Sequence, residues 1–283
     1  MTAIRLAFSP DSDDIFMFWG LLTGKVDTEG LTFEARRADT EALNERAAAG
    51  DLDVIAVSIA AWPAVADNYL LLPSGMSVGR GYGPIVVARR ECDLASLRGS
   101  RIGVPGLRTT AYTVLRLLLP EFTPVVVPIA PYARAFEALR TGEVDAAVLI
   151  HEGRLTYPNE GVAQVCDLGV AWAEATGGLP LPLGANAVRR ALGPSLVMKV
   201  SRLCRASIGW ALEHREDTMS ALLDRESRAD LALGRPLLDR YLAMYANSDS
   251  LDAPPDVRQA VDELYRRAHG AGLIAHAARA EFA

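Results

Sequence analysis

The residues best suited to chemistry follow an apolar run in the middle of the chain. The run from Ala146 to Ile150 has the short, continuous apolar character of a buried β-strand, and it ends at His151, Glu152 and Arg154. Ligands of open α/β sheets collect beyond the carboxyl ends of the strands. An imidazole there can exchange protons near neutral pH, so His151 is a candidate general base. The alternative is a structural histidine whose ring is satisfied by hydrogen bonds in the interior.

Two other polar segments end a predicted strand or open a predicted helix. Arg108-Thr109-Thr110 combines the free N–H groups of a helix start with two hydroxyls and a cation, which favours a carboxylate or phosphate ligand. Helix capping by Thr109, with Arg108 in solvent, uses the same geometry and is the alternative. Ser58 ends the strand predicted at 54–58. With His151 as a base, Ser58 could act as a nucleophile, but no Gly-x-Ser-x-Gly elbow surrounds it. We therefore interpret it as a hydrogen-bond donor to a ligand.

Three acids, Asp11, Asp13 and Asp14, precede a helix that is predicted to begin at Ile15. Acidic residues at this position are typical of helix capping and of favourable interaction with the helix dipole. Three negative charges at one helix start also make that end a poor site for an anion.

The sequence contains no pattern typical of a cofactor or metal site. His151-Glu152 lacks the second histidine of a His-Glu-x-x-His zinc motif, because the required position is Leu155. A dinucleotide fingerprint, a phosphate loop and a lysine in a Schiff-base setting are also missing from the sequence. We therefore predict no cofactor and no metal. Three further histidines are expected at the surface: His214, His269 and His276.

The first part of the chain predicts alternating strands and helices, and the pattern then repeats. Strands are expected at 5–10, 31–37 and 54–58 with helices at 15–22 and 39–49, and again at 101–105, 124–127 and 146–150 with helices ending at 119 and spanning 132–140. The turn Gly50-Asp51-Leu52-Asp53 matches Gly142-Glu143-Val144-Asp145, 92 positions later. Such alternation favours mostly parallel sheets, and self-similarity on this scale indicates two lobes of the same topology.

Two extended segments, at 84–89 and 177–189, are expected to cross between the lobes. Helices predicted at 196–212, 215–223, 228–246 and 256–268 should cover the first lobe. The predicted fold class is therefore α/β: a two-lobed fold like that of type II periplasmic binding proteins, each lobe a mixed, mostly parallel sheet flanked by helices, with a helical C-terminal tail on lobe 1. Residues 1–88 plus 186–283 would form lobe 1 and residues 89–185 lobe 2, with a ligand cleft between them.

Composition narrows the class of protein. The 283 residues carry 29 Lys and Arg against 35 Asp and Glu, a net charge of −6 that is spread along the chain and argues against a nucleic-acid surface. Half of the residues are hydrophobic, as in packed soluble proteins, but no apolar segment is long enough to span a bilayer. The N-terminus begins as a strand, so we expect no signal peptide. Three widely separated cysteines are expected as reduced thiols, and the expected location is the cytoplasm.

At several of these motifs the chain resembles a known family. The residues that carry the resemblance are Ser9-Pro10 with Asp14, Asn44, Arg80-Gly81-Tyr82-Gly83-Pro84, Thr109-Thr110-Ala111-Tyr112, and the segments 150–157 and 178–184. Together they look like 1,4-dihydroxy-6-naphthoate synthase of the futalosine route to menaquinone, over nearly the whole chain. The resemblance implies a carbon–carbon lyase that converts cyclic dehypoxanthinyl futalosine to 1,4-dihydroxy-6-naphthoate without a cofactor.

The same resemblance implies the site residues. His151 matches the family's proton acceptor, and Asn44 matches a position that faces the ligand. The substrate-binding segments match Ala56, Val57 and Ser58, and Thr109 with Thr110. Three departures leave open a subfamily with altered specificity: the first turn reads Ser-Pro-Asp-Ser-Asp-Asp where Ser-Pro-Cys-Pro-Asn-Asp is usual, Gly153 replaces a serine, and Arg108 stands where a histidine is common.

Two other functions stay open on the sequence. A non-enzymatic binding protein for a small carboxylate would share the fold but would need no histidine at that strand end. Chorismate dehydratase, of the same pathway and fold, does not carry the His-Glu-x-Arg motif. The expected partner is a small-molecule carboxylate substrate, without nucleic acid or membrane insertion, and a homodimer is one assembly that the sequence permits.

Overall fold

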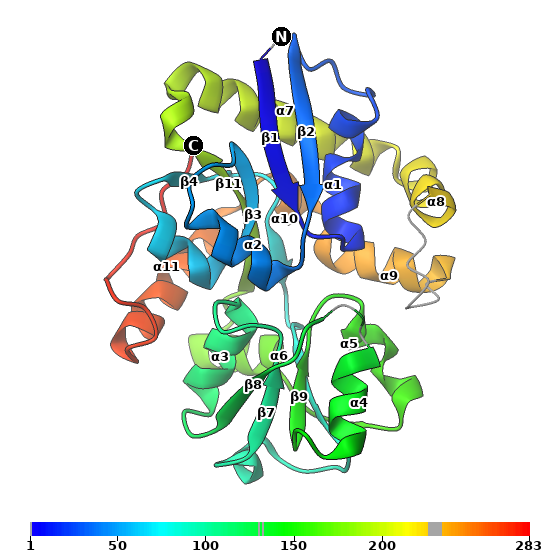
Figure 1. Ribbon diagram of the computed structural model, residues 1–283, viewed down its shortest axis with the longest axis vertical. Coiled ribbons are helices and arrows are strands. Elements are labelled where there is room, and N and C mark those ends of the chain that lie inside the picture. The colour runs from blue at the N-terminus through cyan, green and yellow to red at the C-terminus, as the bar shows by residue number, and fades with distance from the viewer. Residues whose placement is uncertain (1, 130, 132, 226–233) are drawn as a thin grey trace.

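The computed structural model describes residues 2–129, 131, 133–225 and 234–283, which form an upper and a lower lobe in Figure 1. Each lobe is built on one β-sheet with helices packed on its faces, and both chain ends lie in the upper lobe (Figure 1). The two-lobed α/β architecture predicted from the sequence is confirmed. The upper lobe is lobe 1 and the lower one is lobe 2.

Lobe 1 contains a six-stranded mixed sheet. Its strands are β1 (Thr2–Phe8), β2 (Leu31–Arg37), β3 (Val54–Ser58), β4 (Tyr69–Leu71), β5 (Ser77–Gly79) and β11 (Leu181–Arg189). Their order is β2-β1-β3-β11-β4, with β5 also paired to β11. β1 runs parallel to β2 and β3, whereas β11 is antiparallel to its neighbours. The carboxyl ends of β1 and β3 therefore point the same way, toward lobe 2 (Figure 1).

Lobe 2 contains a five-stranded sheet in the order β10-β6-β9-β7-β8. Its strands are β6 (Ile85–Ala88), β7 (Arg101–Val104), β8 (Thr123–Val126), β9 (Ala146–Leu149) and β10 (Ala163–Asp167). β9 lies at the centre and is buried throughout, as its continuous apolar run predicts. β7 runs parallel to β8 and β9, and β6 is antiparallel to β9 and β10.

The helices are distributed between the lobes much as the apolar periodicity predicts. Lobe 2 carries α3 (Thr110–Leu118), α4 (Ala133–Thr141), α5 (Gly153–Thr156) and α6 (Leu168–Thr176). Lobe 1 carries α1 (Ser12–Leu22), α2 (Thr40–Ala47) and the tail helices α7 (Pro194–Glu213), α8 (Arg215–Arg225), α9 (Arg235–Tyr245), α10 (Ser248–Leu251) and α11 (Pro255–Gly270). Short 3₁₀ helices are η1 (Ile59–Val65), η2 (Leu94–Leu97), η3 (Tyr157–Glu160) and η4 (Arg190–Leu192). The helical tail on lobe 1 is confirmed, although residues 132 and 228–233 of the predicted helices lie outside the described residues.

The crossings between the lobes lie a few residues earlier than the predicted boundaries at 88/89 and 185/186. β6, at 85–88, already pairs within the sheet of lobe 2, and β11 joins the sheet of lobe 1 from Leu181. The chain therefore crosses between β5 and β6 and returns between α6 and β11. An apolar run predicts a strand but not the sheet that the strand joins, since pairing depends on distant partners.

In each lobe, the same pair of hydrogen bonds joins the first strand to the turn before the third parallel strand. In lobe 1 the N–H of Arg5 donates to the carboxylate of Asp53 at 2.9 Å, and the N–H of Asp53 donates to the carbonyl of Arg5 at 2.9 Å. In lobe 2 the same two bonds join Arg101 and Asp145, at 2.9 and 2.8 Å. The matching Gly-acid-apolar-Asp turns thus have matching structural roles, which supports the internal repeat.

Close packing of the backbone characterises the outgoing crossing. A Cβ atom at Gly79 would lie 1.9 Å from the carbonyl oxygen of Tyr82, and one at Gly169 would lie 2.1 Å from the same atom. The buried Arg154 guanidinium donates to the carbonyl of Gly83 at 2.6 Å and to Asp167 at 2.7 Å. It also lies 5.8 Å from the ring of Tyr82. The close approach of the backbone at this crossing therefore requires glycine at both positions.

Apolar packing continues from one lobe into the other. One buried cluster includes Trp62 and Tyr265 of lobe 1 and Leu115 and Trp172 of lobe 2. The rings of Trp62 and Tyr265 stack with centroids 5.9 Å apart. No helix within the described ranges is both long and apolar enough to cross a membrane.

Candidate active site between the lobes

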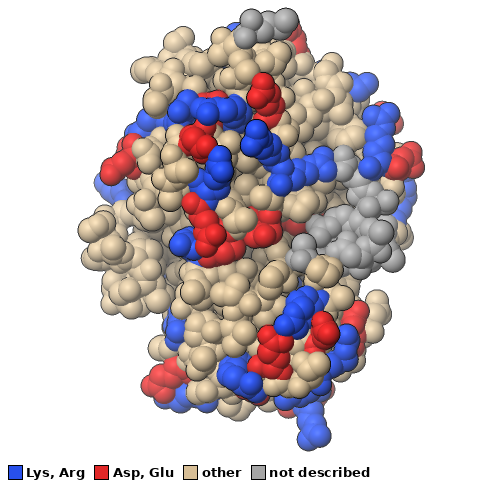
Figure 2. Space-filling view, viewed as in Figure 1, with Lys and Arg blue, Asp and Glu red and all other residues tan. Residues whose placement is uncertain are grey.

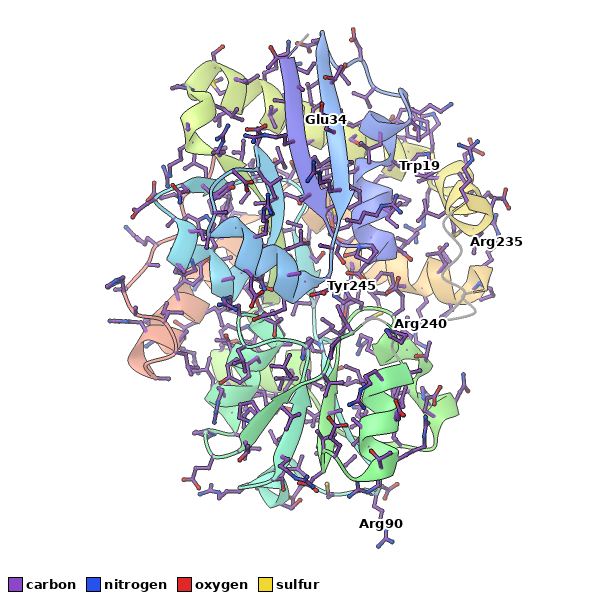
Figure 3. All side chains as sticks on the ribbon, in the orientation of Figure 1. Trp19, Glu34, Arg90, Arg235, Arg240 and Tyr245 are labelled. Atoms are coloured by element: carbon purple, nitrogen blue, oxygen red, sulfur yellow. The ribbon has the colours of Figure 1, made fainter. Side chains whose placement is uncertain are left out.

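The lobes face one another across a cleft with an empty volume of about 760 Å³, its open mouth included. Lobe 1 contributes the loop after β1 and the end of β3, and lobe 2 contributes the start of α3 and the end of β9. Helix α9 adds Tyr241 and Tyr245, and Figure 3 places Tyr245 where the two lobes meet. Among the lining residues that the structure describes, only His151 can carry a positive charge, against three aspartates.

His151 lines this cleft, and both of its ring nitrogens contact lobe 1. Nδ1 lies 2.8 Å from Oδ2 of Asp11 and 3.5 Å from the hydroxyl of Tyr241, while Nε2 lies 3.1 Å from Oγ1 of Thr40. The backbone φ of His151 is 51°, a left-handed conformation that is uncommon outside glycine and asparagine. The backbone thus turns at His151, directly after β9, and the imidazole lies in the cleft.

The surroundings of His151 favour its protonated form. Burial alone would lower the pKa of the imidazole, but the charge and hydrogen bond of Asp11 outweigh burial, and together with the charges of Asp13 and Glu152 they raise the pKa to about 9. At neutral pH this favours an imidazolium paired with the Asp11 carboxylate. A proton acceptor of this kind is strong, but the fraction in the basic form is small until the pH approaches its pKa.

The acids at the start of α1 crowd one another. Burial, followed by the charge of Asp11, raises the pKa of Asp13, which the hydrogen bonds from Ser77 and Tyr241 oppose. Burial and the charges of the other two acids raise the pKa of Asp14 well above its usual value. Donor atoms of Asp11, Asp13 and His151 lie within 4.8 Å of one another, which is a metal-like grouping. Each of these three side chains is, however, already hydrogen-bonded to protein groups.

Helix capping, the sequence interpretation of Asp11, is wrong. Asp11 occupies the N-cap position of α1 but makes no side-chain capping bond. Glu152 of lobe 2, which is fully buried, accepts hydrogen bonds from the backbone N–H of Ser12 at 3.1 Å and from its hydroxyl at 2.7 Å. The first N–H of α1 is thus satisfied from the opposite lobe, an arrangement that no local sequence signal announces.

Ser58 lies in the cleft at the end of β3, with Ala56 and Val57 beside it. Asn44, from α2, is buried behind Ser58 and is not among the described lining residues. Its amide Nδ2 donates to the Ser58 hydroxyl at 3.0 Å, and the Ser58 N–H donates to its Oδ1 at 2.8 Å. Asn44 thus contacts Ser58 rather than the cleft, and it fixes the direction of the hydroxyl.

Thr109 and Thr110 both line the cleft at the start of α3. The Thr109 side chain caps the helix, since its hydroxyl oxygen accepts from Tyr112 N–H at 3.2 Å. The Thr110 hydroxyl accepts from Ala60 N–H at 3.1 Å and donates to the Leu183 carbonyl at 2.7 Å, so it bridges to lobe 1. The first N–H groups of a helix have no partner within it, so this end of α3 can bind an anion as well as being capped.

Arg108 lies apart from the other predicted ligand-binding residues. It is not among the described lining residues, and its half-exposed guanidinium donates to Glu41 at 3.0 Å and to Glu45 at 2.9 Å. Its backbone N–H also donates to Glu41. The sequence predicts a cation for a ligand carboxylate here, but α2 of the opposite lobe supplies two protein carboxylates instead.

The sequence analysis did not identify Thr40, or the two tyrosines of the tail helix α9, as residues that line the cleft. Tyr241 and Tyr245 lie four residues apart on α9, and the helical period places both on one buried face. Their phenol groups on an otherwise apolar stripe were the available signal, but that stripe alone does not show where the helix packs. The remaining histidines, His214, His269 and His276, are exposed as predicted.

A comparison with protein families finds one match over nearly the whole chain. A family model described as menaquinone biosynthesis matches residues 4–270. The chain is 40% identical over 282 residues to the 1,4-dihydroxy-6-naphthoate synthase of Thermus thermophilus, with 100% of both chains covered. It is 36% identical over 274 residues to the enzyme of the same name from Streptomyces coelicolor, covering 96% of this chain and 94% of that one.

Solved structures show the same architecture. A crystal structure of a protein from Archaeoglobus fulgidus superimposes with a TM-score of 0.89 at 41% identity, covering 96% of this chain and 98% of that one. The alkanesulfonate-binding protein of Xanthomonas axonopodis superimposes with a TM-score of 0.73 at 14% identity, covering 99% and 96%. The second likeness concerns the fold alone, and it confirms the predicted periplasmic-binding-protein-like fold.

Proposed function

Because the chain belongs to the menaquinone-biosynthesis family, we propose that it is a 1,4-dihydroxy-6-naphthoate synthase that acts on cyclic dehypoxanthinyl futalosine as a carbon–carbon lyase. The observation that carries the proposal is one imidazole, His151, in a cleft whose other polar groups are acids, hydroxyls and helix amides. A pure binding site for a carboxylate needs no such group, whereas a reaction that begins with proton removal does.

The start of α3 is the proposed seat for the substrate carboxylate. Thr110 and Ala111 line the cleft, and their backbone N–H groups begin the helix. Both the free amides and the helix dipole favour a negative charge there. The three aspartates at the start of α1 disfavour an anion, so the carboxylate is expected at α3 and the hydroxyl-bearing, sugar-derived part near the acids.

His151 is the proposed general base. In its neutral form Nε2 takes a proton from bound substrate, and the electron pair left behind allows a carbon–carbon bond to break so that the sugar-derived fragment leaves. The remaining ring system becomes aromatic, which supplies much of the driving force. The protein then has to hold the substrate in position, provide one base and exclude water.

The expected partner is this small carboxylate, and the cytoplasm is the proposed location. Acidic and basic side chains are interspersed on the face shown in Figure 2, in keeping with the mild net charge. Assembly as a homodimer stays a prediction, which sedimentation of the purified chain would test.

One assay tests the proposal most directly. Purified protein is incubated with cyclic dehypoxanthinyl futalosine, and the products are separated and identified by mass spectrometry. Formation of 1,4-dihydroxy-6-naphthoate with matching loss of the precursor is the expected result. Binding of the precursor without its loss would indicate a non-enzymatic binding protein. Conversion of chorismate to its enolpyruvyl benzoate product would identify a chorismate dehydratase.

A further inference from the structure

The contact between Asp11 and His151 joins groups that belong to different lobes. Asp11 precedes α1 in lobe 1 and His151 follows β9 in lobe 2, with 2.8 Å between Oδ2 and Nδ1. Asp11 is 1% exposed, and the His151 side chain is 19% exposed. The contact is therefore shielded from bulk water, and it exists only while the lobes are together.

Asp11 makes this contact in place of a capping bond, and its Oδ2 also accepts a hydrogen bond from the nearby Ser9 hydroxyl. The N-cap residues Asp39 and Thr109 cap α2 and α3 with their side chains, whereas the Asp11 side chain does not cap α1. Such a cap stabilises a helix, because it satisfies one of the first N–H groups. Glu152, next to His151, satisfies the N–H of Ser12 instead. The carboxylate of Glu152 in lobe 2 thus caps helix α1 of lobe 1. The carboxylate of Asp11, at the cap position of that helix, contacts the imidazole of lobe 2 instead.

We propose that Asp11 is the positioning residue for His151, and that closure of the lobes assembles the pair. The Asp11 carboxylate accepts a hydrogen bond from the N–H at Nδ1, and this bond fixes the tautomer whose lone pair is on Nε2. That nitrogen lies 3.1 Å from the Thr40 hydroxyl at the cleft. The inference rests on the proposed function, in which His151 is the base. During the reaction a substrate proton moves to Nε2, and the resulting imidazolium is stabilised by the Asp11 charge at Nδ1.

Several titratable groups face the ring besides Asp11. They come from the loop after β1, the start of α1, the turn after β9 and helix α9: Asp13, Asp14, Glu152 and Tyr241. Asp13 is the nearest match for Asp11, because it carries the same charge two residues away. Its two oxygens accept from Tyr241 and Ser77, both at 2.8 Å. Removing the Asp13 charge therefore tests electrostatics while the Asp11–His151 bond is retained.

The test compares Asp11→Asn with Asp13→Asn in the full-length protein. Protein labelled with ¹⁵N-histidine gives the pKa and tautomer of His151 without substrate, and the pH profile of kcat/KM gives the pKa of the free enzyme's base. The chain has four histidines, so the His151 signal can be assigned by substitution. We expect the His151 pKa of about 9 to fall further in Asp11→Asn than in Asp13→Asn. An asparagine can donate to Nδ1 and so favours the wrong tautomer, and kcat should fall by about 10²–10⁴-fold.

A third variant, Ser12→Ala, tests the dependence on closure. It keeps every charge around the ring but removes one hydrogen bond between the lobes. The His151 pKa should then lie between those of the wild type and Asp11→Asn, because the open state, without the contact, is more populated. A pKa unchanged by Ser12→Ala would overturn the role of closure.

The result that overturns the whole inference is an Asp11→Asn variant whose His151 pKa, tautomer and pH profile equal those of Asp13→Asn. This outcome differs from failure of the proposed function. If the wild type forms no naphthoate, the magnetic resonance titration still shows whether Asp11 governs His151. If the titration is insensitive to Asp11, the assay still shows whether the chain is the synthase.

Discussion

Asn44 and Ser58 hold one another through two hydrogen bonds, one from the amide to the hydroxyl at 3.0 Å and one from the Ser58 N–H to the amide oxygen at 2.8 Å. Asn44→Ala leaves that buried N–H without its partner, which costs about 1–3 kcal/mol. It also frees the Ser58 hydroxyl, so KM should rise. Thermal unfolding and steady-state kinetics measure both effects. Asn68→Ala, at an exposed position, is the control and should change neither.

Removal of His151 should abolish turnover and leave the fold intact. Asparagine is the best replacement, because it tolerates the left-handed backbone at this position, where φ is 51°. His151→Asn and His151→Ala should both lose more than about 10²-fold in kcat, with His214→Ala as an exposed control. Circular dichroism would check the fold. Near-wild-type rates in either variant would exclude His151 as the base.

Substitution of Thr109 should mainly lower stability, whereas substitution of Thr110 should mainly weaken substrate binding. The Thr109 hydroxyl caps α3, so Thr109→Ala should lower the free energy of unfolding by about 0.5–2 kcal/mol. The Thr110 hydroxyl bridges to Ala60 and Leu183 across the cleft, so Thr110→Ala should weaken substrate binding more than stability. Comparing KM with the melting temperature of each variant decides this. Equal effects on both quantities in the two variants would contradict the division.

Asp14 should make the protein less stable as the pH rises. Burial and neighbouring acids raise its pKa well above the ordinary value, so the folded state binds this proton more tightly than the unfolded state. Stability linked to Asp14 is therefore complete below its unfolded pKa and is lost as the pH rises through its folded pKa. Asp14→Asn should raise Tm at about pH 8, and the gain should shrink at about pH 4, where Asp14 is mostly protonated. A constant Tm difference between the two pH values would refute the assignment.

The buried pair of Arg154 and Asp167 should contribute far more than a surface pair. Their side chains are 10% and 11% exposed. Arg154→Ala removes the cation from a largely buried carboxylate, which keeps only the hydrogen bonds from the N–H groups of Gly169 and Val170, and we expect a loss of about 3–5 kcal/mol. Arg98 and Glu121, with side chains 64% and 67% exposed, form the matched surface pair. Arg98→Ala should cost at most about 1 kcal/mol. Denaturant unfolding of both variants measures the difference.

The alternation of strands and helices was predictable because each element carries its own periodic signal. The bounds predicted at 31–37 and 54–58 coincide with β2 and β3. The short strands β4 and β5 were missed, since three residues are too few to show a period. The sequence also could not predict that β6 joins the sheet of lobe 2, because its partners β9 and β10 lie far along the chain.

In the site, the sequence identified the residues that end predicted strands or open predicted helices, but it did not identify the contacts made between the two lobes. Ser58, Thr109, Thr110 and His151 follow from local pattern and line the cleft. The acids at the start of α1 were interpreted as caps, because a carboxylate before a helix usually is one. Asp11 and the ring of His151 lie 140 positions apart in the sequence, so their contact can be seen only in the folded chain.

The bonds of Glu152 with Ser12 and of His151 with Asp11 and Thr40 all join lobe 2 to lobe 1. In the proposed reaction, a substrate that approaches Nε2 has to displace the Thr40 hydroxyl, and the naphthoate product leaves more easily when the remaining bonds between the lobes are broken. Each cycle of the proposed reaction then includes opening of the lobes, in which these bonds break, and closure, in which they form again. We therefore expect the rate of lobe opening, as well as the strength of the base, to limit turnover.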